Sequence, residues 1–248
     1  MTGSVVQAVG LTKIFGEGGS KVHALKGVSV EFATGQFTAI MGPSGSGKST
    51  LLHCLAGLET PTSGTIRLTE ADLTTLPDDA LTKLRRDRVG FLFQSFNLLP
   101  NLSAERNILL PLKLARREPD DKWFRTLIAM LGIEHRLSHL PAEMSGGEQQ
   151  RVAAARALVS KPAVVFADEP TGALDSRAGT DLLGFLSESV RQLGQTIVMV
   201  THDPMAAAYA NRVVFMADGQ FATELHNPRH DDVLAIVRQL AGARTPGC

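Results

Sequence analysis

Apolar residues along the chain fall into short continuous runs that alternate with stretches of helical spacing. Continuous runs are typical of strands buried on both faces of a parallel sheet. Such runs cover residues 37–41, 89–93, 163–167 and 195–200. The segments between and after them predict helices near residues 48–58, 78–87, 145–159, 177–193 and 231–240. This alternation of strands and helices predicts an α/β fold.

The segment from Ala104 to about Leu137 also has helical spacing, but it contains two prolines. A proline inside a helix removes one N–H donor and clashes with the preceding turn. We therefore expect Pro111 and Pro119 to divide this segment into two or three helices.

Shorter strands are expected near both ends of the chain. Residues 5–11, 28–32 and 65–68 carry alternating or clustered apolar residues. Residues 212–216 and 220–223, joined at Asp218-Gly219, are typical of a hairpin. The last residues, 241–248, are expected to form a mobile tail.

Composition narrows the class of protein. The chain has 248 residues, with 25 Lys and Arg against 25 Asp and Glu, and this balance argues against a general nucleic-acid-binding surface. The two cysteines have no metal-ligand spacing, so a reducing compartment is the default. No apolar run reaches the ~18–20 residues that span a bilayer, and no signal pattern opens the chain. We expect a soluble, cytoplasmic protein whose membrane role, if it has one, depends on a partner.

A glycine-rich loop after the 37–41 run fits the phosphate-binding pattern G-x-x-x-x-G-K-[ST]. Glycines let several backbone N–H groups point into one cavity, and the following helix adds its positive dipole end. Lys48 can reach the β- and γ-phosphates, and Ser49 can offer a hydroxyl to Mg²⁺. The predicted phosphate-binding residues are Gly42, Pro43, Ser44, Gly45, Ser46, Gly47, Lys48, Ser49 and Thr50.

Polar residues follow three of the other apolar runs. The 163–167 run ends in Asp168 and Glu169, the form of a Walker B strand, in which the aspartate holds Mg²⁺ through water and the glutamate orients or deprotonates the attacking water. Gln94 leaves the 89–93 strand and can bind Mg²⁺ or water, although it is also compatible with a solvated loop. His202 follows the 195–200 strand, at the edge where ligands bind in such sheets, or lies in a surface loop.

A second anion site is predicted at Ser145-Gly146-Gly147-Glu148. Ser145 and Glu148 have the spacing of a capping box, which explains why a helix starts there. The capping box does not explain the two glycines, which lower helix stability but expose N–H groups to an anion. Phe15, just before the first turn, can either stack on adenine or fill the core at a strand end.

These motifs, in this order, resemble the ATP-binding subunit of ATP-binding-cassette (ABC) transporters over residues 5–220. The resemblance implies that Phe15 stacks on adenine and that Gln94 senses Mg²⁺ and the permease. It also implies that Glu169 is the catalytic base and that His202 contacts the γ-phosphate. Asp175, in the turn after Glu169, would link the two sites of a dimer. Met144 departs from the family's usual Leu, and Glu148 from the Gln that many members carry.

The sequences of residues 90–100 and 169–176 are similar to those of the MacB/LolD branch of this family. The branch contains macrolide and peptide exporters, lipoprotein-release machines and cell-division relatives. By this resemblance we expect a phosphate-loop (RecA-like) core with an antiparallel β subdomain at residues 1–96 and 160–225. A helical subdomain would hold residues 97–159, and a short helix and tail residues 226–248.

The expected function is hydrolysis of ATP, which drives an integral membrane permease from the inner face of the membrane. Two copies would sandwich each ATP, and Ser49, Gln94 and Asp168 would hold Mg²⁺. The alternative is a mechanical or regulatory ATPase that transports nothing, as in the cell-division relatives. The permease identity, the substrate and the direction of transport are not encoded in these motifs.

Overall fold

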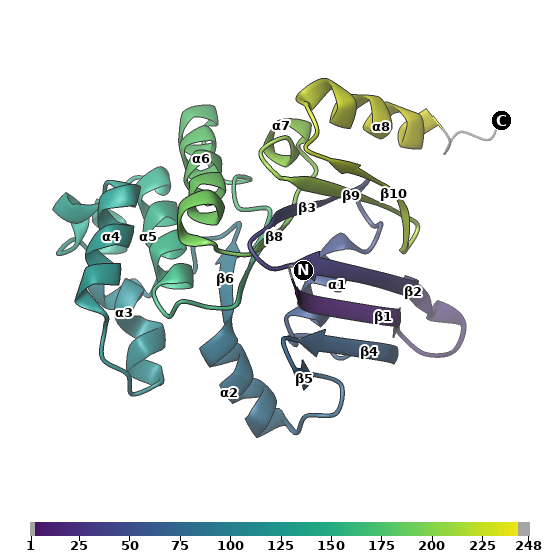
Figure 1. Cartoon of the computed structure of the whole chain (residues 1–248), viewed down its shortest axis with the longest axis horizontal. Coiled ribbons are helices and arrows are strands. Elements are labelled where there is room, and N and C mark those ends of the chain that lie inside the picture. The colour runs from purple at the N-terminus through teal and green to yellow at the C-terminus, as the bar shows by residue number, and fades with distance from the viewer. Residues whose placement is uncertain (1–2, 243–248) are drawn as a thin grey trace.

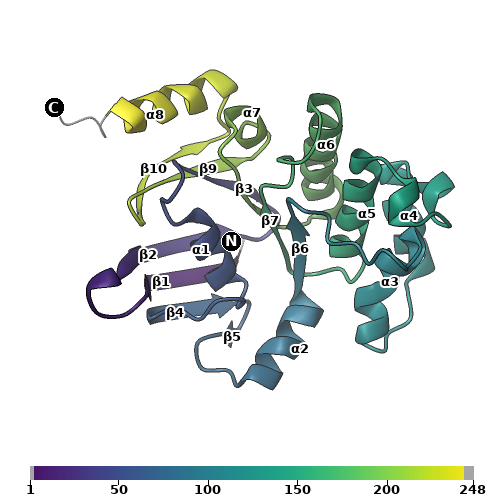
Figure 2. The ribbon, with the colours of Figure 1, turned by 180° about the vertical axis from the view of Figure 1, so that it is seen from behind.

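The computed structural model describes residues 3–242 of the chain. Figure 1 shows a small sheet at one end, a larger sheet in the middle and a group of helices at the other end. The view from behind in Figure 2 gives the same order. The expected tail at 241–248 lies almost entirely outside the described residues. Within residues 3–242, no helix has the length and apolar character needed to cross a membrane.

The central sheet holds six strands in the order β10-β9-β3-β8-β7-β6. Its β3, β8, β7, β6 and β9 pair in parallel, and β10 pairs antiparallel with β9. The bounds are β3 Phe37–Met41, β6 Val89–Phe93, β7 Val164–Asp168, β8 Ile197–Val200, β9 Arg212–Ala217 and β10 Gln220–His226. The four expected buried runs and the terminal hairpin are therefore confirmed.

The second sheet is antiparallel, as expected, with the order β2-β1-β4-β5. Its strands are β1 Ser4–Phe15, β2 Val22–Ala33, β4 Ser63–Leu68 and β5 Ala71–Asp72. The first two are longer than their apolar patterns predicted, because polar residues continue the pairing around a short 3₁₀ turn, η1 (Gly18–Ser20).

Helices cover both faces of the central sheet. The α-helices are α1 Lys48–Leu55, α2 Asp78–Arg88, α3 Ala104–Leu114, α4 Asp121–Leu131, α5 Gly146–Leu158, α6 Ser176–Leu193, α7 Pro204–Ala207 and α8 His230–Gly242. Two further 3₁₀ turns, η2 Glu134–Arg136 and η3 Pro141–Glu143, lie between α4 and α5.

Alternate residues of one strand serve two different cores. Val165 and Ala167 of β7 pack on the side of α5 and α6, whereas Val164 and Phe166 pack with α1 and the antiparallel sheet. Successive side chains of a strand point to opposite faces, so a continuous apolar run is what a strand with two covered faces requires. Packing on both faces therefore fixes the positions of the strand ends, and with them the positions of the polar residues that follow.

The expectation that Pro111 interrupts a helix is wrong, because α3 continues through it. The N–H of Ala115 still donates to the carbonyl of Pro111 at 3.0 Å, so the ladder resumes at once. The buried side chains of Ile108 and Leu112 anchor the helix on both sides of the proline. Pro119, by contrast, does lie between α3 and α4.

Candidate functional site

Residues 42–47 connect β3 to α1 and form a tight loop. A Cβ atom at Gly42 would lie 2.2 Å from the carbonyl oxygen of Met216, and one at Gly47 would lie 2.3 Å from that of Ala24. Gly47 is also the N-cap of α1, with a φ of 94°. Both positions therefore require glycine for space and for conformation, since the φ of Gly42 is 154°.

The N-terminus of α1 is open. No side chain caps it, so the N–H groups of its first turn have no side-chain acceptor. The Lys48 ammonium is buried and donates to the Pro43 carbonyl at 2.9 Å. Burial lowers the pKa of Lys48, and nearby Glu169 and Asp168 act against that shift. Among the described side chains, the buried Ser46 Oγ lacks a hydrogen-bond partner. Free donors, a buried cation and a helix N-terminus together suit an anion.

Two acidic side chains leave the end of β7 in different directions. The Ser49 hydroxyl donates to Asp168 Oδ1 at 3.1 Å. Glu169 Oε1 lies instead 3.0 Å from Nδ1 of His202, which follows β8. Glu169 has a φ of 45°, a left-handed conformation that is uncommon for residues other than glycine. This backbone turn separates the two carboxylates, as the sequence prediction requires.

Gln94 joins this group at a cavity of about 480 Å³. The cavity is lined by Ser49, Phe93, Gln94, Ser95, Asn97, Asp168 and Glu169. Gln94 also packs closely on Gly172, where a Cβ atom would lie 2.7 Å from its Nε2. The structure thus brings together five residues that the sequence placed on four separate segments: Ser49, Gln94, Asp168, Glu169 and His202.

Four more of the predicted residues lie at a second cavity, of about 450 Å³. Ser145, Gly146, Gly147 and Asp175 line it, and Asp175 caps α6 by accepting from the N–H groups of residues 177 and 178. Among the residues lining the two cavities, none is shared. One chain therefore carries two separate polar sites.

The capping box at α5 is confirmed. The Glu148 N–H donates to Ser145 Oγ at 3.3 Å, and the Ser145 N–H donates to Glu148 Oε2 at 2.8 Å. Packing within the chain explains why residue 147 is a glycine, because a Cβ there would lie 2.9 Å from the Cβ of Ala178 on α6. A Cβ at Gly146 would meet only the edge of the Phe96 ring, at 3.4 Å.

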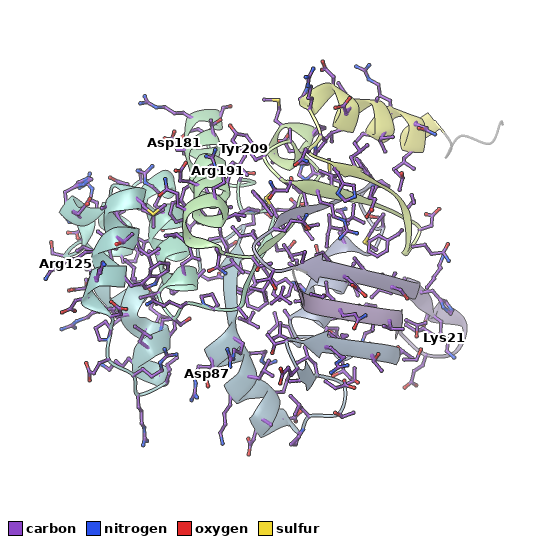
Figure 3. All side chains as sticks on the ribbon, in the orientation of Figure 1. Lys21, Asp87, Arg125, Asp181, Arg191 and Tyr209 are labelled. Atoms are coloured by element: carbon purple, nitrogen blue, oxygen red, sulfur yellow. The ribbon has the colours of Figure 1, made fainter. Side chains whose placement is uncertain are left out.

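Phe15 ends β1, at the connection to β2 that Lys21 marks in Figure 3. It is 41% exposed and belongs to neither hydrophobic core, so it is not a core residue. The Lys13 ammonium lies 4.8 Å from its ring centre. An exposed ring beside a cation is suited to stacking on a planar, electron-rich group.

Two residues that contact the predicted ones, His53 and Gln150, belong to none of the motifs. His53 Nε2 lies 3.4 Å from Asp168 Oδ2, and the hydrogen bond to Asp168 raises the pKa of His53. Its position four residues after Ser49 puts both on one helix face, a signal that was available. Buried Gln150 donates to the carbonyls of Phe93 and Pro170, at 3.1 and 2.7 Å, and so ties α5 to both strand ends.

The phosphate loop, the acidic strand end and the doubly covered sheet define a phosphate-loop NTPase. The family model for ABC transporters matches residues 25–172, so the chain belongs to the ABC transporter family. It is an ATP-binding subunit and an ATPase.

Relatives and solved structures agree with this family. The chain is 44% identical over 226 residues to the bacitracin export ATP-binding protein BceA of Halalkalibacterium halodurans, covering 90% of this chain and 89% of that one. It is 45% identical over 222 residues to the macrolide export ATP-binding/permease protein MacB of Marinobacter nauticus, covering 89% of this chain but only 34% of that longer one.

Its fold is similar to the dimeric ATP-binding cassette MJ0796 in a post-hydrolysis state with ADP and Pi. That match has a TM-score of 0.81 and 39% identity and covers 90% of this chain and 99% of the other. CbiO1 of Clostridium perfringens, part of an ABC transporter complex, matches with a TM-score of 0.80 and 28% identity, over 98% and 96% of the two chains.

Proposed function

We propose that this chain is the ATP-hydrolysing subunit of an exporter, bound to an integral membrane permease at the cytoplasmic face of the membrane. The observation that carries this is the convergence of Ser49, Asp168, Gln94 and Glu169 on one cavity beside the phosphate loop. The export functions printed for BceA and MacB support the coupling to transport. No nucleic acid is involved in this proposal, in line with the balanced charge.

The residues at the 480 Å³ cavity fit Mg²⁺. A hydroxyl, a carboxylate and an amide oxygen, from Ser49, Asp168 and Gln94, are the hard donors that this cation prefers. The ion would neutralise charge on the phosphates of ATP. In our proposal Lys48 leaves the Pro43 carbonyl and binds the β- and γ-phosphates, and the open N-terminus of α1 binds the phosphate oxygens.

Glu169 and His202 would act on the attacking water and the γ-phosphate. Their contact at 3.0 Å fixes the Glu169 carboxylate away from Asp168, so Glu169 is available to hold the water and accept its proton. His202, whose side chain is 67% exposed, can reach a phosphate outside the chain's own core. Phe15 would hold the adenine ring by stacking.

We further propose that two copies share each ATP. The phosphate loop of one copy would face Ser145, Gly146, Gly147 and Glu148 of the other, with Asp175 between the two sites. The two separate cavities in one chain support this arrangement. Residues 1–225 would form the ATP-binding domain, with the helical part at 97–159 directed to the permease and residues 226–248 as a C-terminal addition.

Glu169→Gln tests the catalytic assignment. It keeps the shape of the side chain and removes the base, so phosphate release should fall by about 10²–10⁴. ATP binding should persist, and the protein should run as a dimer on size exclusion with ATP and Mg²⁺. Normal hydrolysis would remove Glu169 from the mechanism, and lost ATP binding would make it a metal or structural residue.

A mixing experiment tests the shared site. Lys48→Ala and Gly146→Asp chains, each inactive alone, form heterodimers with one site doubly altered and one intact. Recovered hydrolysis in the mixture supports a shared site, whereas no recovery after proven subunit exchange counts against it. Co-purification of the tagged Glu169→Gln chain with a permease from ATP-treated, solubilised native membranes tests the membrane partner.

A further inference from the structure

A charged network lies behind the N-terminus of α5. The Glu148 side chain is only 12% exposed, and its Oε2 accepts from the backbone and the hydroxyl of Ser145 at 2.8 and 2.9 Å. Its Oε1 lies 2.7 Å from Nε of Arg136, in the 3₁₀ turn η2. His135 Nε2 is 3.8 Å from the same oxygen, and His139 Nε2 is 3.3 Å from Nη1 of Arg136.

This network keeps a negative charge at the start of a helix. Hydrogen bonds from the Ser145 backbone, Arg136 and the Ser145 hydroxyl lower the pKa of Glu148 to about 2, so it is ionised at neutral pH. A carboxylate here stabilises the helix dipole. It would also repel a phosphate group that approaches the Ser145 hydroxyl, which is 2.9 Å from it.

We propose that Arg136 is a positioning residue that neutralises Glu148, so that the N-terminus of α5 can receive the phosphate of an ATP bound to a second copy. Arg136 and Glu148 are both absent from the residues that line the 450 Å³ cavity, but Ser145 lines it, so Arg136 acts on this cavity through Glu148 and Ser145. The guanidinium keeps the capping carboxylate in place while cancelling its charge. This inference rests on the proposed sharing of ATP between two copies.

The test measures ATP-induced dimerisation by sedimentation in the Glu169→Gln background. Adding Arg136→Ala should weaken the dimer by about 10- to 100-fold, because like charges then face each other. Arg136→Gln, which keeps a donor without charge, should weaken it similarly, and Arg136→Lys should recover most of the affinity. The defect should shrink at high salt, which screens the repulsion.

Removal of the carboxylate is the decisive arm. Arg136→Ala with Glu148→Gln should dimerise within about twofold of Glu148→Gln alone, since the two residues then act as one coupled pair. The control is Arg191→Ala on α6 (Figure 3), which breaks an exposed pair with Glu188 and should change nothing. Melting temperatures identify variants that fail to fold, and Arg136→Gln and Arg136→Lys then carry the comparison.

Three outcomes would overturn the inference. If Arg136→Ala dimerises as tightly as its parent, Arg136 has no role in receiving phosphate. If the double variant stays as weak as Arg136→Ala, the arginine acts by holding the fold and not by neutralising charge. If the Glu169→Gln parent itself remains monomeric with ATP, the shared site fails, and the inference fails with it.

Discussion

The two helices proposed to face ATP begin in opposite ways. At α1 the N-cap is Gly47, in a left-handed conformation, and no side chain satisfies the first turn. At α5 the N-cap is Ser145, and a complete capping box with Glu148 satisfies it from within. The backbone N–H donors at the start of α1 have no side-chain acceptor and can bind a ligand. At the start of α5, one backbone N–H already donates to the Ser145 hydroxyl.

We expect this difference to give the N-termini of α1 and α5 different roles in binding ATP. An uncapped helix N-terminus is less stable without an anion, and the buried Lys48 beside it adds a cation. A capped end holds its shape without ligand, and the carboxylate of Glu148 would repel phosphate if Arg136 did not neutralise it. We therefore expect the phosphate loop to bind ATP alone and the start of α5 to add to an ATP already held in the proposed dimer.

Lys48→Ala should produce the largest effect on this comparison. Truncating a buried group that pairs with charge costs about 2–5 kcal/mol, so ATP affinity should fall roughly 30-fold to several thousand-fold. Fluorescent nucleotide titration of the single chain measures it. Lys161→Ala, which removes an exposed lysine paired with Asp120, is the control. Equal loss in Ser145→Ala would erase the distinction between the two ends.

Gly47→Ala should destabilise the fold by about 2–5 kcal/mol, from strain at φ 94° and the contact with the Ala24 carbonyl. Gly45→Ala is the matched control, because its φ is 77° but nothing lies within 4 Å of the new Cβ. It should cost only about 1–2 kcal/mol. Urea denaturation without nucleotide gives both values, and equal losses would show that conformation alone sets the requirement.

At α5 the glycines should respond less. Gly147→Ala brings its Cβ to 2.9 Å from that of Ala178 and should cost about 1–3 kcal/mol. Gly146→Ala, whose Cβ would lie 3.4 Å from the Phe96 ring, should stay within about 0.5 kcal/mol of the native chain. The same denaturation assay compares them. If Gly146→Ala proves the more destabilising, the packing at α6 is not what selects glycine.

An effect comparable to that of Gly147→Ala is expected from the pH dependence of the α5 cap. Folding lowers the Glu148 pKa to about 2, so its ionised form stabilises the fold above the ordinary value near 4.5. That contribution, about 1.5–3 kcal/mol for hydrogen bonds to a charged group, is lost as pH falls from 4.5 towards 2. The stability gap between native chain and Glu148→Gln should therefore narrow between pH 6 and pH 3. A difference in stability that stays constant between pH 6 and pH 3 would refute the stabilising role of ionised Glu148.

Local signals were sufficient wherever one short segment sets its own structure. Buried strands, the hairpin at Asp218-Gly219 and the Ser145–Glu148 capping box all depend on neighbours in sequence, and all were predictable. The prediction at Pro111 is wrong because the packing of Ile108 and Leu112 outweighs the loss of one hydrogen bond in α3.

Contacts between distant segments were harder to foresee. The strand order, with β3 between β8 and β9, is not written in any local pattern. The need for glycine at 147 depends on Ala178, 31 positions later and on another helix. The pairing of Glu169 with His202 and of Glu148 with Arg136 likewise required the folded chain.

The contact between Lys48 and the Pro43 carbonyl has one more consequence. Without nucleotide, the hydrogen bond from Lys48 to Pro43 holds the two ends of the loop together. We expect this bond to keep the curvature that phosphate binding requires. In the proposed site, phosphate binding would exchange one partner of the ammonium for another and would not have to order a disordered loop. Little configurational entropy would be lost in that exchange, so we expect ATP to enter and ADP to leave without the loop unfolding and refolding in each cycle.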